Sequence, residues 1–383
     1  MSAREVTLLV FSGSGGGSPV ERWVSQAREA AALDLVDRAK RIAQIGRIIV
    51  ATPSAEFAAE LGARAVEVEL LDGENFHFGR ELWRLIAGYE IEKLLYFGGG
   101  SGALLQEEGL SSMAELLLEE EVFLVNNFYS TDFAALAPAH LLLELPPPRR
   151  DNQIGWLLWE AGLIPKELPR TAATQLDIDT PTDLLILKLH PEAGAHTRNF
   201  LNGIPLDPAP LEGALDYLTD REATVLVAGR VPSYAWRYLE EETACQVRVF
   251  SEERGMEASG KVERGAVRSL LGLFLEEVGP RRLFQALGEL ADLALLDSRV
   301  LFAHLGRRPT AADRFWSDLL RPEEIEDPLV KEFTARALAA PVPVILGGHS
   351  LVAGGLYALV ELAWRGRELE RRVEPIQQRR SET

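Results

Sequence analysis

The chain has 383 residues, enough for two domains of ordinary size, and its 47% hydrophobic residues can form a full core, which excludes wholesale disorder. Its 40 basic and 58 acidic side chains give a net charge of −18, which argues against duplex nucleic acid or an anionic membrane as the main partner. Cys245 is the single cysteine, so neither an internal disulfide nor a cysteine zinc cluster can form. No apolar run has the length of a membrane span, and we expect a cytoplasmic protein.

The first half of the chain alternates predicted strands and helices. Short runs rich in β-branched and apolar residues predict strands over residues 6–11, 47–51, 65–71, 93–97 and 122–125. Apolar residues at helical spacing between them predict helices over residues 19–45, 78–89 and 112–119. This alternation is typical of βαβ units and therefore of a mainly parallel sheet between two layers of helices.

A break in this pattern follows near residue 190, where residues 190–210 contain four prolines and show little periodicity. We expect a domain over residues 1–190, a linker over 191–212, a second α/β domain over 213–366 and a charged tail over 367–383. Predicted strands in the second half cover residues 224–228, 246–250 and 342–346, and predicted helices cover 267–277, 283–290 and 351–364.

Three of the predicted strands lead directly into loops rich in glycine and serine, over residues 11–18, 97–102 and 346–355. In a doubly wound sheet such loops lie at the carboxyl ends of the strands, where ligands bind. Glycine lets the backbone approach a phosphate, and the next helix offers N–H groups, although glycine also serves in ordinary tight turns. The candidate nucleotide-binding residues are Gly13, Ser14, Gly15, Gly16, Gly17, Ser18, Arg22, Gly99, Gly100, Ser101 and, after a later strand, Asn127.

Two familiar phosphate motifs fit these loops poorly. A P-loop needs a lysine after its second glycine, and no lysine follows any of the three loops. The dinucleotide fingerprint would have Ser18 in place of its third glycine, and the second predicted strand ends without the expected acidic residue. An NAD(P)-dependent oxidoreductase is therefore kept only as an alternative.

A short motif over residues 176–184 has a clear local interpretation as a helix start. Thr180 is the expected N-cap, Pro181 takes the first helical position, and Asp183 follows three residues after the cap. Asp177 and Asp179 have no part in that interpretation. Two carboxylates before a helix could hold a hard divalent cation, so we predict a Mg²⁺ site there.

The Asp177–Leu184 motif, near the end of an α/β domain, resembles the close of nucleotidyltransferases with the nucleotide-diphospho-sugar transferase (GT-A-like) fold. Members include the molybdenum-cofactor guanylyltransferases, the 2-phospho-L-lactate guanylyltransferases and the methylerythritol cytidylyltransferases. The glycine-rich first loop and the glycine turn at residues 98–105 match that family in kind, and the resemblance covers roughly residues 5–190. It implies a Rossmann-type domain that binds a nucleoside triphosphate or a nucleotide-activated small molecule, in a cofactor-biosynthesis role, with Mg²⁺ at Asp177 and Asp179.

The catalytic motifs of that family are degenerate in this chain. Only Arg22 follows the first loop, where the family has an arginine and then a lysine, and glycines replace the metal-binding aspartate of the central turn. Nucleotidyl transfer and a non-catalytic regulatory or scaffold role therefore both stay open, as does self-association. In either case we expect the partner to be a small-molecule nucleotide.

One region of the second half is rich in arginine although the chain is acidic. It contains Arg299, Arg307, Arg308, Arg314 and Arg321. Such a cluster either forms surface ion pairs or holds a phosphate or carboxylate.

Overall fold

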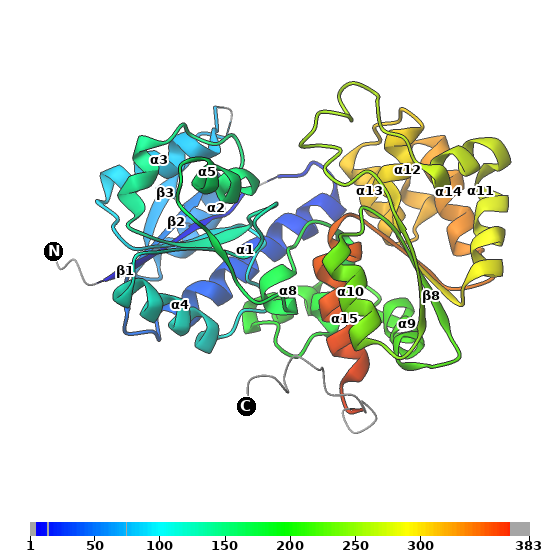
Figure 1. Ribbon diagram of the computed structural model, residues 1–383, viewed down its shortest axis with the longest axis horizontal. Helices are drawn as coiled ribbons and strands as arrows, with labels where there is room; N and C mark the ends of the chain where they lie inside the picture. The colour runs from blue at the N-terminus through cyan, green and yellow to red at the C-terminus, as the bar shows by residue number, and fades with distance from the viewer. Residues whose placement is uncertain (1–4, 14, 74, 368–383) are drawn as a thin grey trace. The chain divides into compact units, whose positions relative to one another are not determined.

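The computed structural model of the protein describes residues 5–13, 15–73 and 75–367, and the chain forms two compact units. Unit one comprises the chain up to residue 178 together with residues 191–204. Unit two comprises residues 179–190 together with the chain from residue 205 onward. Each unit has its own sheet and its own helices (Figure 1). The expected fold class, α/β with a second α/β part, is therefore confirmed.

Unit one contains a seven-stranded sheet in the order β3-β2-β1-β4-β6-β5-β7. Its paired neighbours are parallel, except that β6 runs antiparallel to both β4 and β5. The predicted mainly parallel sheet is confirmed. The strands are β1 (Val6–Phe11), β2 (Ile45–Thr52), β3 (Glu67–Leu70), β4 (Leu94–Gly98), β5 (Val122–Val125), β6 (Phe133–Ala137) and β7 (Lys166–Glu167).

Two apolar cores form on opposite faces of this sheet, because successive strand residues point to opposite sides. In β1, Leu8 and Val10 belong to one core, whereas Leu9 and Phe11 belong to the other. Helices α1, α2 and α4 contribute to the first core and α3 and α5 to the second, which gives three layers; Figure 1 shows α3 above the sheet and α4 below it. The helices of unit one are α1 (Pro19–Ala39), α2 (Ala55–Gly62), α3 (Phe78–Gly88), α4 (Glu107–Glu119), α5 (Ile154–Glu160), α6 (Ala172–Gln175) and α8 (Ala195–Gly203), with 3-10 turns η1 (Ala139–Glu144) and η2 (Asp151–Gln153).

Unit two contains a four-stranded, all-parallel sheet in the order β11-β10-β8-β9. Its strands are β8 (Thr224–Gly229), β9 (Gln246–Ser251), β10 (Leu293–Asp297) and β11 (Val344–Gly347). Its helices are α7 (Pro181–Leu189), α9 (Ala209–Thr219), α10 (Ser233–Glu242), α11 (Leu270–Leu290), α12 (Ser298–His304), α13 (Ala311–Asp318), α14 (Pro328–Leu338) and α15 (Gly354–Trp364), with η3 (Pro322–Glu324) and η4 (Ser350–Val352). The two helices predicted at residues 267–290 correspond to α11, which is kinked at Gly279 (φ 74°).

The chain crosses between the units at positions other than the single domain boundary expected near residue 190. It enters unit two at residue 179, returns to unit one at residue 191 and enters unit two again at residue 205. Residues 179–190 form α7 of unit two, where Thr182 Oγ1 donates a hydrogen bond to the Leu346 carbonyl. The expected linker over residues 191–212 instead contains α8 and the beginning of α9. Asp34 of α1 holds the start of α8, because its carboxylate accepts hydrogen bonds from the His196 and Thr197 amides at 2.9 Å. The prolines of residues 190–210 therefore do not mark an irregular linker, because two helices form within or begin in this segment.

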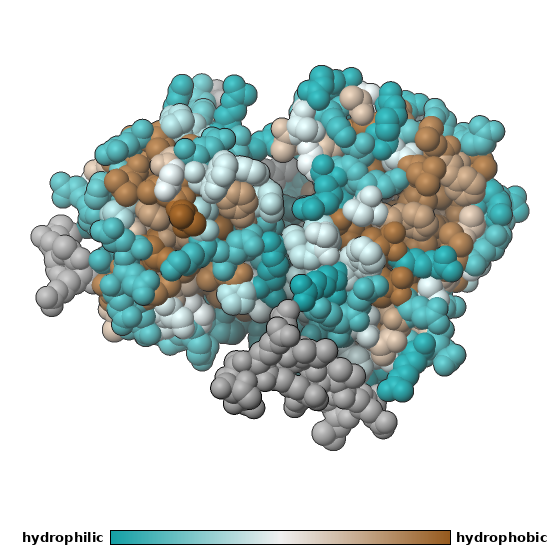
Figure 2. Space-filling model, viewed as in Figure 1, coloured by the Kyte–Doolittle hydropathy of each residue, from teal (hydrophilic) through white to brown (hydrophobic). Residues whose placement is uncertain are grey.

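Hydrophilic residues cover much of the face of each unit in view, with apolar residues interspersed among them (Figure 2). No helix in the described part of the chain is both long enough and apolar enough to cross a bilayer. The predicted charged tail lies almost wholly outside the described residues, which end at residue 367.

Candidate functional site

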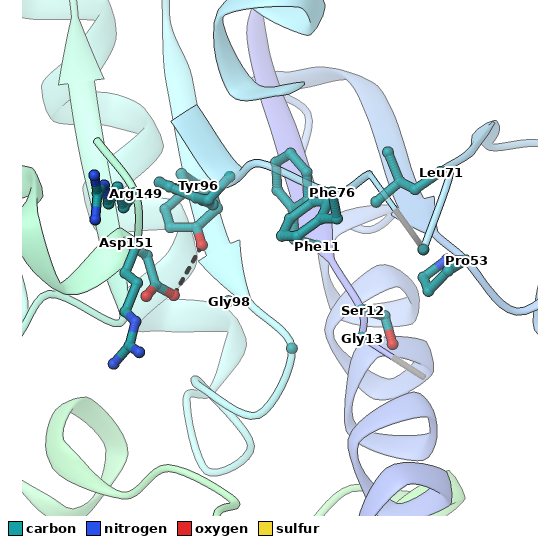
Figure 3. A pocket seen from close by; sticks show the side chains of 14 residues that line it. Phe11, Ser12, Gly13, Pro53, Leu71, Phe76, Tyr96, Gly98, Arg149 and Asp151 are labelled. Atoms are coloured by element: carbon teal, nitrogen blue, oxygen red, sulfur yellow. Dashed lines mark hydrogen bonds between the residues drawn. The ribbon is translucent and has the colours of Figure 1, made fainter. Parts of the chain in front are cut away.

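Unit one has a cavity of about 460 Å³ at the carboxyl ends of β1 and β4. This is the sheet edge at which the sequence predicts ligand binding, and β1 and β4 are neighbours in the sheet. Figure 3 shows the cavity lining, which comes from the ends of the two strands, from the loops after β2 and β3, and from the segment before α5. The lining residues are Phe11, Ser12, Gly13, Pro53, Leu71, Gly73, Phe76, Phe78, Tyr96, Gly98, Gly99, Arg149, Arg150 and Asp151.

One wall of the cavity is aromatic. The centroid of the Phe11 ring lies 6.1 Å from the ring centroid of Phe76, 5.6 Å from that of Phe78 and 5.9 Å from that of Tyr96. Phe76 is 46% exposed, whereas the other three residues are buried. The exposed ring of Phe76 therefore packs on the buried ring of Phe11 and remains accessible to a ligand. A flat, apolar ligand group such as a nucleobase can pack on such a surface.

Another part of the lining is backbone from the two glycine-rich loops. A Cβ on Gly99 would lie 2.5 Å from the Phe11 carbonyl oxygen and 2.8 Å from Ser12 Cα, so only glycine lets the loops approach this closely. Ser12 is 1% exposed, and its Oγ has no hydrogen-bond partner in the described structure. Among the described residues, the amides of Gly13, Gly16 and Gly17 also donate no hydrogen bond. Of these residues, Ser12 and Gly13 line the cavity, and their donors are available to a phosphate oxygen.

Charged side chains lie at the end of the cavity next to Tyr96 (Figure 3). The Tyr96 hydroxyl donates a 3.1 Å hydrogen bond to Asp151 Oδ2. Burial, followed by the negative charge of Asp151, holds the pKa of Tyr96 well above its ordinary value, so the phenol remains a proton donor. Arg149 and Arg150 precede this carboxylate on an exposed segment and supply positive charge to the same end.

The first predicted loop is organised mainly by local contacts with α1. Ser18 is the N-cap of that helix and forms a capping box with Glu21. The Arg22 Nη1 donates a 2.7 Å hydrogen bond to the Gly17 carbonyl, and the Gly15 amide donates to Ser25 Oγ. Gly13 lines the cavity, whereas Ser14 lies outside the described residues. The roles predicted for Gly15, Gly16, Gly17, Ser18 and Arg22 stay predictions.

The binding residues predicted in the second loop lie in two different environments. Gly99 lines the cavity, and Ser101 Oγ donates to the carbonyls of Gly98 (2.8 Å) and Asp132 (3.2 Å), which is a loop-holding role. A Cβ on Gly100 would lie 2.5 Å from Asp177 Oδ1. Asn127 lies outside the cavity lining, and its Oδ1 accepts a hydrogen bond from the Tyr129 amide, as turn-forming asparagines do.

The two candidate metal ligands fall in different units. Asp177, of unit one, lies at the carboxyl edge of the sheet against Gly100, and its neighbour Ile178 donates to the Gly100 carbonyl at 3.2 Å. Asp179, of unit two, is exposed, and its amide donates to Asp183 Oδ2 at 3.0 Å. Among the residues that the structure describes, no group of three or more His, Cys, Asp or Glu side chains could hold a metal ion. The Mg²⁺ site stays a prediction.

Sequence reasoning identified the loops of this site but missed its walls. The sequence places Phe11 and Tyr96 on two predicted strands, and only the register of β1 against β4 brings these two rings together. Arg150 and Asp151 follow three prolines and have no motif around them. A usable signal existed for Phe11 alone, since it is the last strand residue before the first glycine-rich loop.

Comparisons with known proteins find similarity in structure but not in sequence. No protein-family model matches the chain, and no curated protein matches it. Among solved structures, a nucleotidyl transferase from Methanothermobacter thermautotroptrophicus is 17% identical, with 52% of this chain and 99% of that chain covered and a TM-score of 0.38. A cytidylyltransferase from Leptospira borgpetersenii is 16% identical, with coverages of 52% and 92% and a TM-score of 0.38. A CMP:2-keto-3-deoxy-manno-octonic acid synthetase complexed with CTP is 12% identical, with coverages of 47% and 95% and a TM-score of 0.34. The finer resemblance to the guanylyltransferases stays a prediction.

Proposed function

We propose that unit one binds a nucleotide in the cavity at the ends of β1 and β4, as a nucleotidyltransferase-like domain. In this arrangement the base packs on the aromatic wall of Phe11, Phe76 and Tyr96. The phosphates lie toward Ser12 and the glycine-rich loop that follows it, whose Gly13 amide has no acceptor among the described residues. The cavity volume of about 460 Å³ is in the range of small-molecule sites.

The buried hydroxyl of Ser12 is the observation that carries this proposal. A buried hydroxyl without a partner costs on the order of 1–3 kcal/mol, so folded proteins rarely keep one without a reason. Ser12 Oγ is such a group, and Ser12 is one of the residues that line the cavity, next to Gly13. A phosphate oxygen that accepts a hydrogen bond from this hydroxyl removes the cost on binding.

The chain's own residues would act mainly by positioning and by neutralising charge, which is what nucleotidyl transfer requires. Arg149 and Arg150 would offset negative charge at one end of the cavity. Asp177 would hold Mg²⁺ together with phosphate oxygens, since magnesium is often bound by one or two carboxylates plus substrate phosphates. When bound, the ion supplies Lewis-acid stabilisation of the charge on the transferred phosphoryl group.

A calorimetric titration with ATP, CTP, GTP and NADPH, each with and without Mg²⁺, tests the proposal. We expect saturable binding of at least one triphosphate by the wild-type protein. Ser12→Ala should weaken that binding about 10- to 100-fold, the equivalent of one hydrogen bond to a charged group, and should not lower the melting temperature. No triphosphate binding, or binding of NADPH alone, would contradict the proposal.

Thr197→Val is the matched control for Ser12→Ala. Thr197 is also in unit one, is fully buried, and has an Oγ1 without a partner among the described residues, but it lies on α8 away from the cavity lining. Both variants remove one unsatisfied hydroxyl, so their stabilities should change similarly. Only Ser12→Ala should weaken nucleotide binding. An equal loss of nucleotide affinity in both variants would show that the Ser12 hydroxyl does not bind the phosphate.

The role of magnesium is tested separately with Asp177→Asn. If Asp177 binds the ion, this variant loses the Mg²⁺-dependent part of nucleotide binding and its melting temperature without ligand changes little. Mg²⁺-dependent binding that is unaffected in Asp177→Asn would disprove the metal assignment without affecting the nucleotide site itself.

Binding without transfer remains a second candidate, favoured by one observation. The Arg22 guanidinium donates to the Gly17 carbonyl and is therefore engaged within its own loop. Metal-independent triphosphate binding, with no pyrophosphate release in the presence of Mg²⁺ and candidate acceptors, would identify this role.

A further inference from the structure

A second cluster of charged side chains lies at the carboxyl edge of the sheet of unit two. Asp297, at the end of β10, is fully buried, and Arg230, which follows β8, donates to its two carboxylate oxygens at 2.6 and 3.2 Å. Burial acts to raise the pKa of Asp297, but Arg230 holds that pKa below its ordinary value, so the carboxylate is charged. Arg299 makes a two-pronged contact with the buried Asp318, at 2.5 Å to each oxygen. These two arginines are therefore matched by two aspartates.

Arg314 is different, because no ion pair or hydrogen bond of its side chain occurs among the residues that the structure describes. It lies on α13, one turn before Asp318, and α13 packs against β11. Its Nε is buried without a partner, although the side chain as a whole is only half-buried. Burial and the positive charge of Arg299 lower the pKa of Arg314, yet a guanidinium does not lose its proton in a protein. The Nε donor of a charged guanidinium is thus left without an acceptor.

His349 adds a second unsatisfied group from another direction. It lies in the loop that follows β11, and its Nδ1 is buried without a partner in the described structure. Burial, together with the positive charge of Arg230, lowers the pKa of His349 to about 4, so its ring is neutral at pH 7. A neutral ring has one N–H donor, which can serve an anion without bringing a charge into the site.

We propose that Arg314 and His349, with Arg230 beside them, bind a phosphate group of a small-molecule ligand at the carboxyl edge of the sheet of unit two. The donors come from α13, from the loop after β11 and from the loop after β8, and β11 and β8 flank β10 in the sheet. Arg299, which follows β10, bonds to Asp318 of α13 and to the Gly347 carbonyl at the end of β11, so α13 reaches the same sheet edge. The positive charge of Arg230 acts on both Arg314 and His349, and donors from several elements can surround a tetrahedral oxyanion. All these residues belong to unit two, so the inference does not depend on the nucleotide site of unit one.

Titration of the full-length protein with inorganic phosphate, followed by calorimetry in a phosphate-free buffer, tests this inference. We expect saturable binding with a Kd on the order of 1 mM, and about tenfold or greater weakening in Arg314→Gln. Arg307→Gln is the matched control, since Arg307 is exposed, its side chain has no hydrogen bond or ion pair among the described residues, and the charge change is the same. This control should bind phosphate as the wild type does.

A structural role for Arg314 predicts a different pattern of results. If the side chain stabilises the fold, Arg314→Gln lowers the melting temperature in phosphate-free buffer, whereas a ligand-binding role leaves that temperature unchanged or raises it. Acetate supplies the planar comparison and should bind more weakly than phosphate. Undiminished phosphate binding in Arg314→Gln, an equal loss in Arg307→Gln, or acetate binding as tight as that of phosphate would overturn the inference.

Discussion

Substitution of Asp183 should remove a pH dependence of stability from unit two. Asp183 is fully buried, and its Oδ2 accepts hydrogen bonds from the Asp179 amide, the Thr180 amide and Thr180 Oγ1 at 3.0, 2.7 and 3.0 Å. Burial, followed by the charge of Asp179, raises the pKa of Asp183 from 3.8 to about 7. The folded chain therefore keeps a proton between pH 4 and 7 that the unfolded chain has lost, so the contribution of Asp183 to stability is complete below about pH 4 and falls as the pH rises toward 7.

The size of this effect follows from the two pKa values. One pKa unit corresponds to about 1.4 kcal/mol, and integration from pH 5 to pH 7 gives a loss of about 2 kcal/mol in the free energy of unfolding. In Asp183→Asn the amide oxygen can still accept the bonds from the Asp179 and Thr180 amides, but the side chain has no charge to bury. Urea unfolding of both proteins at pH 5, 6, 7 and 8 should show the wild type losing about 2 kcal/mol relative to the variant between pH 5 and 7. A constant difference across this range, or one that grows in the wild type's favour, would refute the reasoning.

Three further predictions concern unit one. Gly99→Ala should destabilise the protein by more than about 2 kcal/mol in urea unfolding, because its Cβ would meet the Phe11 carbonyl at 2.5 Å, whereas Gly213→Ala on α9, with nothing within 4 Å, should be neutral or slightly stabilising. Asp34→Ala should cost about 2–4 kcal/mol of unfolding free energy, since the partly buried amide of His196 and the buried amide of Thr197 lose their acceptors. Phe76→Ala should weaken triphosphate binding about tenfold in the calorimetric titration with little change in melting temperature, because Phe76 is 46% exposed and lines the cavity.

The alternation of strands and helices could be predicted because its signals are local. The strand at residues 6–11 and the start of the first helix at Pro19 agree with β1 and α1 in the structure. The capping box of α7 was also predictable, since its residues are neighbours in the chain: Thr180 and Asp183 satisfy each other's backbone as expected. Glycine-rich loops after buried strands indicated the correct edge of the sheet for the same reason.

Features that depend on distant residues could not be predicted in this way. Residues 133–137 form β6, yet their alanine-rich composition has weak strand propensity, and antiparallel pairing with β4 and β5 determines their conformation. The start of α8 depends on Asp34, more than 150 residues earlier in the chain. The aromatic wall likewise arises from strand register and from the loop that carries Phe76. Arg314 is only one of five clustered arginines in the sequence, and what distinguishes it is the buried Nε that has no partner among the described residues.

The central claim is that the cavity at the ends of β1 and β4 is a nucleotide site. A crystal structure of the protein with a saturating nucleoside triphosphate tests it most directly. The account predicts a base on the ring of Phe76 and a phosphate oxygen within hydrogen-bond distance of Ser12 Oγ. A triphosphate bound elsewhere on the molecule, with this cavity filled only by solvent, would contradict it.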